Sequence, residues 1–194
     1  LTRLPTFTSL FLSRTRVYND FKQRIDEIQS VINIKGLDEQ KQNIINKLSY
    51  INIITSLDTF ICDIILTKII QDEESFNNFF NSIPPCKKKD EMTKLKEDNL
   101  VAQWEQKAIE YVMRTSYSNI DTIKDILKEL FKVSIIDTNG KMKKHFYYRN
   151  LLAHRNGRKK DGGYINITNE ELKSLITDTQ SIAKQIQTKI KPEH

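Results

Sequence analysis

The sequence predicts an all-α protein, a bundle of long antiparallel helices with shorter helices packed against them. The 194 residues include 5 glycines and 4 prolines, which are few turn-formers for a fold of many short strands. Apolar residues recur three or four positions apart through most of the chain, the spacing that forms one face of a helix. The length suits a single domain with a substantial core. We expect that domain at residues 13–191, after an N-terminal extension at residues 1–12.

The first two predicted helices supply most of the apolar residues. One begins near Thr15 and ends before Gly36, a residue type that readily adopts the left-handed conformation that closes a helix. The other covers residues 38–70 and carries apolar side chains on more than one face, so we expect it to be the most buried helix. Residues 71–99 are less regular, contain a Pro-Pro pair and end in a polar run. They predict a polar insertion or loop.

The second half of the chain shows renewed periodicity. It predicts helices at residues 100–112, 120–131, 141–156 and 168–190. Gly157 closes the third of these, and a basic, glycine-containing loop follows it. At the start of the last helix, Thr168 and Glu171 have the spacing of a capping box.

The positive charge of the chain is local. The net charge is +6, yet residues 141–160 hold eight Lys or Arg and no acidic residue, so the remainder of the chain sums to −2. Such a cluster is typical of a site that meets phosphates. A solvated basic loop without a partner is the alternative interpretation.

Composition argues against several classes of protein. Polar residues interrupt the apolar stretch at residues 44–70, so no run approaches the roughly 20 residues of a membrane span. Cys62 and Cys86 make neither a disulfide framework nor a metal site, and the acidic residues show no metal-ligand grouping. The N-terminus lacks the apolar region of a secretory signal. We expect a cytoplasmic protein with no membrane partner, no metal and no cofactor.

Among the three histidines, His154 has the most informative neighbours. At about 100° per residue, Asn150 and His154 share one face of the predicted helix, while Arg149 lies about 140° from His154 around the axis. The long Arg149 side chain can still curl to share a ligand with the imidazole. Leu151 and Leu152 point toward a core.

These residue types suit the cleavage of RNA without a metal. One group must take the proton from the 2′-hydroxyl, another must protonate the leaving 5′-oxygen, and positive charge must stabilise the phosphorane. Histidine titrates near the working pH, and arginine matches phosphoryl oxygens in charge and geometry. Because the helix supplies one such histidine, we expect the second acid or base from the same helix of a second subunit across a two-fold axis.

The motif also resembles a known family. Arg149-Asn150, three further residues and His154, followed by Arg155-Asn156-Gly157, resemble the R-N-x-x-x-H signature of the HEPN superfamily, in particular its RiboL-PSP branch. Upstream, residues 53–63 are similar to an early helix of that branch with the pattern apolar-x-x-x-Leu-acidic-x-aromatic-x-x-Asp. In element order the resemblance covers residues 40–190, and its specific part is about ten residues.

The resemblance implies an all-α bundle whose two motif helices meet at a homodimer interface and form a shared, metal-independent RNA-cleaving cleft. It implies that Arg149 and His154 are catalytic, that Asn150 orients His154 or the phosphate, and that Asp58 faces the cleft. It also implies a toxin or phage-defence role, with an antitoxin or defence-system partner. In nucleotidyltransferase-paired HEPN toxins a Tyr stands two residues after the His, where this chain has Asn156.

Other residues near the motif suit contacts with RNA. Tyr147 or Tyr148 can stack on bases, and of the two we assign this role to Tyr148. The cationic candidates for contacts with phosphates are Arg155, Arg158, Lys159 and Lys160. Two alternatives to a nuclease remain open: a non-catalytic RNA-binding or scaffold module of the same fold, and a structural adaptor dimer that regulates a partner protein.

Overall fold

The computed structural model describes residues 14–71, 74–75, 77–78, 101–115, 117 and 119–190, and these residues are predominantly helical. Within them, one isolated antiparallel bridge between Arg158 and Tyr164 is the extent of β structure. The predicted all-α fold is therefore confirmed. The helices are α2 (Arg14–Ile32), α3 (Glu39–Gln71), α6 (Val101–Arg114), α7 (Ile120–Phe131), α8 (Lys141–Arg155) and α9 (Asn169–Lys189), with a 3-10 turn at Thr138–Gly140.

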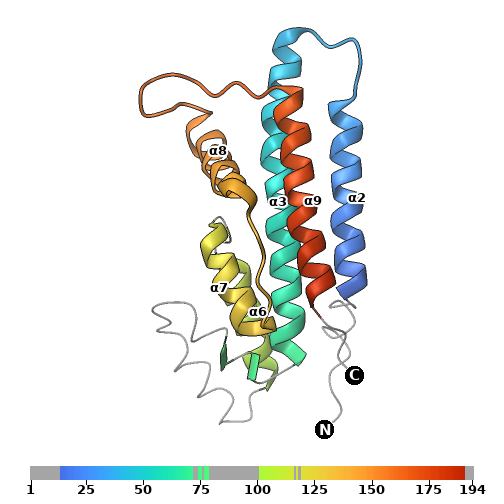
Figure 1. Cartoon of the computed structure of the whole chain (residues 1–194), viewed down its shortest axis with the longest axis vertical. Coiled ribbons are helices and arrows are strands. Elements are labelled where there is room, and N and C mark those ends of the chain that lie inside the picture. The colour runs from blue at the N-terminus through green and yellow to red at the C-terminus, as the bar shows by residue number, and fades with distance from the viewer. Residues whose placement is uncertain are drawn as a thin grey trace.

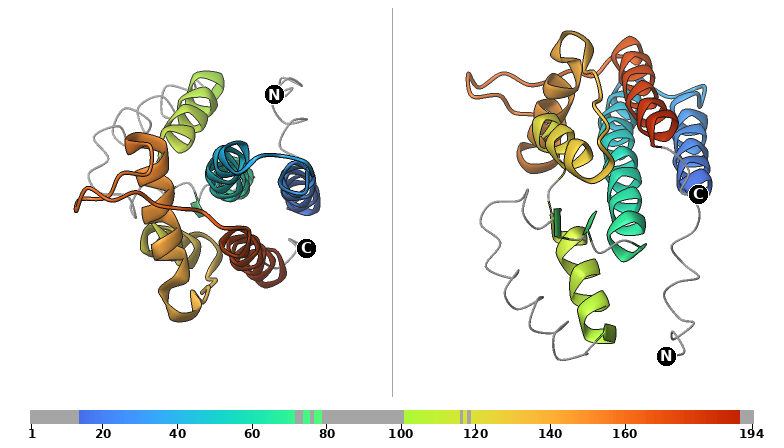
Figure 2. Two further views of the ribbon diagram at one scale, coloured as in Figure 1. Left: turned by 90° about the horizontal axis from the view of Figure 1, so that it is seen from above. Right: turned by 60° about the horizontal axis from the view of Figure 1, so that its bottom comes forward.

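Helices α2, α3 and α9 stand side by side and form the long part of the molecule (Figure 1). Seen from above, α8 lies across this group rather than along it, and the segment between α8 and α9 projects outward (Figure 2). α3 is the common neighbour, since it contacts α2, α6, α8 and α9. Its most buried side chains, which form the centre of the core, include Ile53, Ile54, Leu57, Ile61 and Ile65.

Helix α3 is more apolar than the sequence pattern predicted. The segment Glu39–Ile69 is long and apolar enough to cross a membrane by length and composition, contrary to the expectation that polar interruptions exclude it. In this fold 61% of its most apolar window is buried inside the protein. A central core helix passes the same test, because a helix covered on several sides is apolar around most of its circumference.

Burial of α3 is nevertheless incomplete. Ile44 and Leu48 are 52% and 55% exposed, although both were expected to be covered. They are four residues apart and so lie on one face of the helix, which the described part of the chain leaves open. The expected extension at residues 1–12 and most of the expected insertion at residues 71–99 lie outside the described residues, and the domain boundaries stay predictions.

The end of α8 directs the chain toward α9. Asn156 and Gly157 follow the helix with φ of 50° and 81°, and the Gly157 amide donates to the carbonyl of Leu151 at 2.9 Å. The Gly157 carbonyl in turn accepts from the amide of Ile165 at 2.9 Å. This closure returns the loop to the start of α9, where Thr168 forms the predicted capping box.

We expect Gly157→Ala to destabilise the protein by about 1 to 2 kcal/mol, the cost of placing a Cβ in the left-handed region. The added carbon would also lie 3.3 Å from Cδ2 of Leu152. Urea unfolding measures the effect, with Gly163→Ala in the same loop as the control, because Gly163 does not have a positive φ. Equal stability of the two variants would contradict the assigned backbone constraint.

Candidate functional site

The crossing of α8 over α3 brings Arg149 to Asp58. One guanidinium nitrogen of Arg149, Nη2, lies 3.8 Å from the Asp58 carboxylate oxygen Oδ2, and the side chains are 22% and 20% exposed. An ion pair in so sheltered a position is screened less by solvent and salt than a surface pair. The two residues are 91 positions apart, and the helix packing alone makes them neighbours.

Asn150 contacts Arg149 rather than His154. Its Oδ1 accepts a hydrogen bond of 3.1 Å from Nη1 of Arg149. The guanidinium therefore has a carboxylate on one side and a carboxamide on the other, which restricts its orientation. In the described structure Asn150 orients the arginine, where the family resemblance implied the histidine or the phosphate.

Arg149, Asp58 and Asn150 form a polar cluster in which two buried atoms lack hydrogen-bond partners among the described residues. Oδ1 of Asp58 and Nε of Arg149 are buried and have no hydrogen-bond partner among the described residues. Burial raises the pKa of Asp58 from 3.8 to about 6, and the charge of Arg149 acts in the opposite direction. The site thus holds a carboxyl group that changes its proton occupancy close to neutral pH.

A cavity of about 440 Å³ opens beside the pair. Asp58 and Arg149 line it together with Thr55, Thr59 and Cys62 of α3 and with residues that follow or end α6. Burial, followed by the nearby carboxylates, raises the pKa of the Cys62 thiol to about 12, so this thiol stays protonated and is a poor nucleophile. The polar groups in this lining are the Arg149 guanidinium, the carboxyl groups of Asp58 and Asp63, the Cys62 thiol and hydroxyls.

His154 stands apart from this cavity lining. It lies in the last turn of α8, is exposed, and its imidazole has no hydrogen-bond partner among the described residues. Arg155, Arg158 and Lys160 are also exposed, and Lys159 is half-buried. The structure therefore gathers the arginine, asparagine and aspartate of the predicted site, and presents the histidine and the basic residues to solvent.

The aromatic pair of α8 is placed differently from the expectation. Tyr148 is half-buried, with its ring centroid 6.4 Å from that of Tyr50 and the Lys144 ammonium 5.2 Å from its centre. Tyr147 is 49% exposed. Because a base needs a free ring face, Tyr147 is the better stacking candidate of the two.

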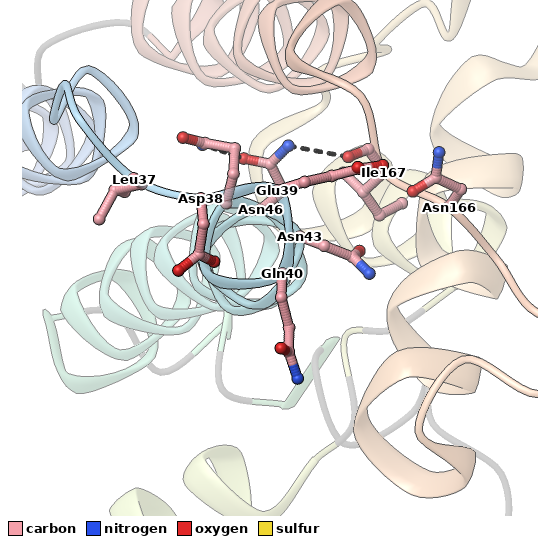
Figure 3. Close-up of a pocket in the computed structure, with 9 residues that line it drawn as sticks. Leu37, Asp38, Glu39, Gln40, Asn43, Asn46, Asn166 and Ile167 are labelled. Atoms are coloured by element: carbon pink, nitrogen blue, oxygen red, sulfur yellow. Dashed lines mark hydrogen bonds between the residues drawn. The ribbon is translucent and has the colours of Figure 1, made fainter.

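A second cavity, of about 780 Å³, lies at the start of α3 (Figure 3). Carboxamides dominate its lining: the Asn46 side chain donates to the carbonyl of Ile167 at 2.8 Å, and Asn43 and Asn166 extend on the same side of the helix. Asp38 and Glu39 also line it. With acidic and neutral groups at its walls, this cavity does not have the charge of a phosphate site.

Sequence reasoning missed one buried cluster. His145, which the sequence analysis did not single out, is 8% exposed and lies between Tyr50 of α3 and Asp178 of α9. The sequence did contain a signal for this burial. His145 is three residues after Met142 and one before Phe146, and both of these apolar residues are buried on α8. A histidine at such positions faces the core and needs polar partners there.

Comparison with known proteins places this helical fold in the HEPN superfamily. The model of the RiboL-PSP-HEPN family matches residues 19–192, and the chain belongs to that family. Searches of curated proteins and of solved structures found no match. Family membership suggests an RNase-like or RNA-binding function, in agreement with the coarse expectation from the sequence.

We expect Arg149→Met to raise the pKa of Asp58 above its value of about 6, since the guanidinium is the group that lowers it. Carboxyl ¹³C NMR across a pH series measures this shift. In the wild type the folded state binds this proton more tightly than the unfolded state, so the Asp58 contribution to stability declines as pH rises from about 4 to about 6. Lys143→Met, which removes an exposed cation paired with Asp121, should leave the Asp58 titration unchanged. An Asp58 midpoint near 4 in the wild type would contradict the assigned environment.

Proposed function

We propose that the protein is a metal-independent endoribonuclease that cleaves RNA through attack of a 2′-hydroxyl on the adjacent phosphate. The observation that supports this most is the sheltered cluster of Arg149, Asp58 and Asn150 at a cavity, on the helix that also carries His154. It combines an oriented cation for a phosphoryl group with titratable groups for proton transfer.

In the proposed reaction a base takes the proton of the 2′-hydroxyl, and the oxygen attacks phosphorus. The P–O5′ bond breaks, and the 5′-oxygen receives a proton from an acid. The products are a 2′,3′-cyclic phosphate and a 5′-hydroxyl. We assign one proton transfer to His154 and stabilisation of the phosphorane to Arg149, whose fork remains charged throughout. Asn150 holds the guanidinium for this task.

The second proton-transfer group has two candidate sources. One is Asp58, which adjoins Arg149 and has a pKa of about 6, close to the working pH. The other is His154 of a second copy of the chain, placed across a two-fold axis in a homodimer. We propose the homodimer with a composite site, and a test of subunit mixing separates the two sources.

The exposed basic residues after the motif give RNA a path toward the site. Arg155, Arg158, Lys159 and Lys160 are proposed to contact phosphates, and Tyr147 or Tyr148 to stack on a base.

We further propose that the protein is a cytoplasmic toxin or phage-defence effector, restrained by an antitoxin or defence-system partner. A non-catalytic RNA-binding or scaffold module of the same fold is the second candidate, since the basic cluster serves it equally well. A structural adaptor dimer is the third.

We expect the purified protein to cleave labelled RNA in excess EDTA, leaving 2′,3′-cyclic phosphate ends. His154→Ala and Arg149→Ala should each lower the rate by about 100-fold or more, the usual contribution of a proton-transfer or phosphate-stabilising group. Arg16→Ala, at an exposed arginine of α2, is the matched control and should cleave normally.

Two other outcomes of this assay would overturn the nuclease assignment. Retention of RNA without cleavage by the wild type, with affinity that decreases when Arg158 or Lys160 is removed, would establish the binding module. Absence of both cleavage and binding would leave the adaptor, and a protein partner would then be sought.

We expect co-expression of wild-type and His154→Ala subunits to give mixed dimers with activity well below half that of the wild type, because a composite site needs the histidine of each copy. Light scattering establishes the dimer, and differently tagged subunits allow the mixed species to be purified. Mixed dimers with half the activity, or an active monomer, would assign the second proton transfer to Asp58 of the same chain.

A further inference from the structure

Three helices meet at a buried histidine that is outside the proposed reaction. Nδ1 of His145, in α8, lies 2.7 Å from the hydroxyl of Tyr50 in α3, and Nε2 lies 3.1 Å from Oδ2 of Asp178 in α9. The Tyr50 and His145 side chains are buried, and Asp178 is 16% exposed. Both ring nitrogens are therefore engaged, each by a different helix.

The surroundings of Asp178 fix the direction of these hydrogen bonds. Its Oδ1 lies 3.3 Å from the Lys141 ammonium, and its Oδ2 accepts from the Ser174 hydroxyl at 3.3 Å. A carboxylate that is paired with an ammonium and accepts from a hydroxyl acts as an acceptor toward the imidazole as well. His145 thus donates from Nε2, and Nδ1 accepts from the Tyr50 hydroxyl, which defines one tautomer.

Burial keeps this imidazole and this phenol neutral. It lowers the pKa of His145, although the hydrogen bond with Asp178 acts in the opposite direction, and it raises the pKa of Tyr50. In this low-dielectric position each hydrogen bond is directional and each unpaired polar atom is costly. In the observed arrangement of α8 relative to α3 and α9, both ring nitrogens of His145 and the Tyr50 hydroxyl have hydrogen-bond partners.

We infer that His145 is a positioning residue for Arg149, acting through the orientation of α8. The two residues are one helical turn apart, about 6 Å along the axis, and their partners on α3, Tyr50 and Asp58, are eight residues apart on that helix. Two points of α8 are thereby attached to α3, and Asp178 attaches the first of them to α9 as well. With the histidine fixed, rotation of α8 is blocked and the guanidinium stays at the carboxyl of Asp58.

The test uses variants that remove one hydrogen bond at a time. Tyr50→Phe deletes one hydroxyl, Asp178→Asn weakens the acceptor, and His145→Gln retains a side chain that can donate and accept. Thr177→Ala and Thr188→Ala, which delete exposed hydroxyls of α9 that bond only to their own helix, are the matched controls. Thermal unfolding first establishes that each variant folds. His145→Gln replaces His145→Ala if the alanine variant does not fold.

The first readout does not depend on enzymatic activity. In ¹⁵N-histidine NMR spectra of the wild type we expect His145 in the Nε2–H tautomer, and in Tyr50→Phe we expect faster amide hydrogen exchange at residues 146–152 and a changed Asp58 titration. A wild-type His145 that is protonated on Nδ1, or exchange and titration that are unchanged in Tyr50→Phe, Asp178→Asn and His145→Gln alike, would overturn the inference.

The second readout rests on the proposed function. We expect the RNA cleavage rate at saturation to fall about tenfold or more in Tyr50→Phe, because small displacements of a catalytic group are costly, while RNA affinity changes less than twofold. Partial recovery in His145→Gln relative to His145→Ala would support the positioning role. If the wild type cleaves no RNA, the proposed function fails, and the tautomer and exchange measurements still decide the inference.

Discussion

The packing of α8 across α3 is the interaction on which the candidate site depends. Burying a charged side chain such as Arg149 costs several kcal/mol unless a partner is positioned to meet it. Asp58 is that partner, and it is available because the apolar side chains of α8, among them Phe146 and Leu152, hold the helix against the core. Removing Asp58 and Arg149 from water is unfavourable: the pKa of Asp58 is raised, and one atom of each side chain has no hydrogen-bond partner among the described residues. The burial of the apolar side chains of α8 offsets this desolvation cost.

Two kinds of polar contact attach α8 to its neighbours, and they differ in what they permit. The hydrogen bonds of His145 with Tyr50 and Asp178 are enclosed, satisfied at both ring nitrogens and closed to a ligand. The pair of Arg149 and Asp58 is only partly enclosed and opens on a cavity. The fully hydrogen-bonded contact of His145 therefore lies beside the incompletely hydrogen-bonded pair of Arg149 and Asp58. This arrangement is expected where a fold must hold a reactive group in position for a ligand.

α3 has two roles that explain its composition. Its isoleucines and leucines form the core against four other helices, which makes the helix apolar enough to resemble a membrane segment. On the side toward α8 it also carries Tyr50 and Asp58, which contact His145 and Arg149. A single long helix therefore fixes the relative positions of the positioning histidine's partner and of the candidate site.

Local pattern by itself determined the helices, because a helical face repeats within a few residues and caps such as Thr168 with Glu171 are local contacts. It also determined the motif on α8, the basic segment and, through that motif, the family. It could not decide that Asp58 contacts Arg149, that Asn150 turns to the arginine, that Tyr148 is half-covered, or that His145 joins three helices. These relations link residues far apart in the chain or depend on which face of a helix its neighbours cover, and both are set when the helices pack.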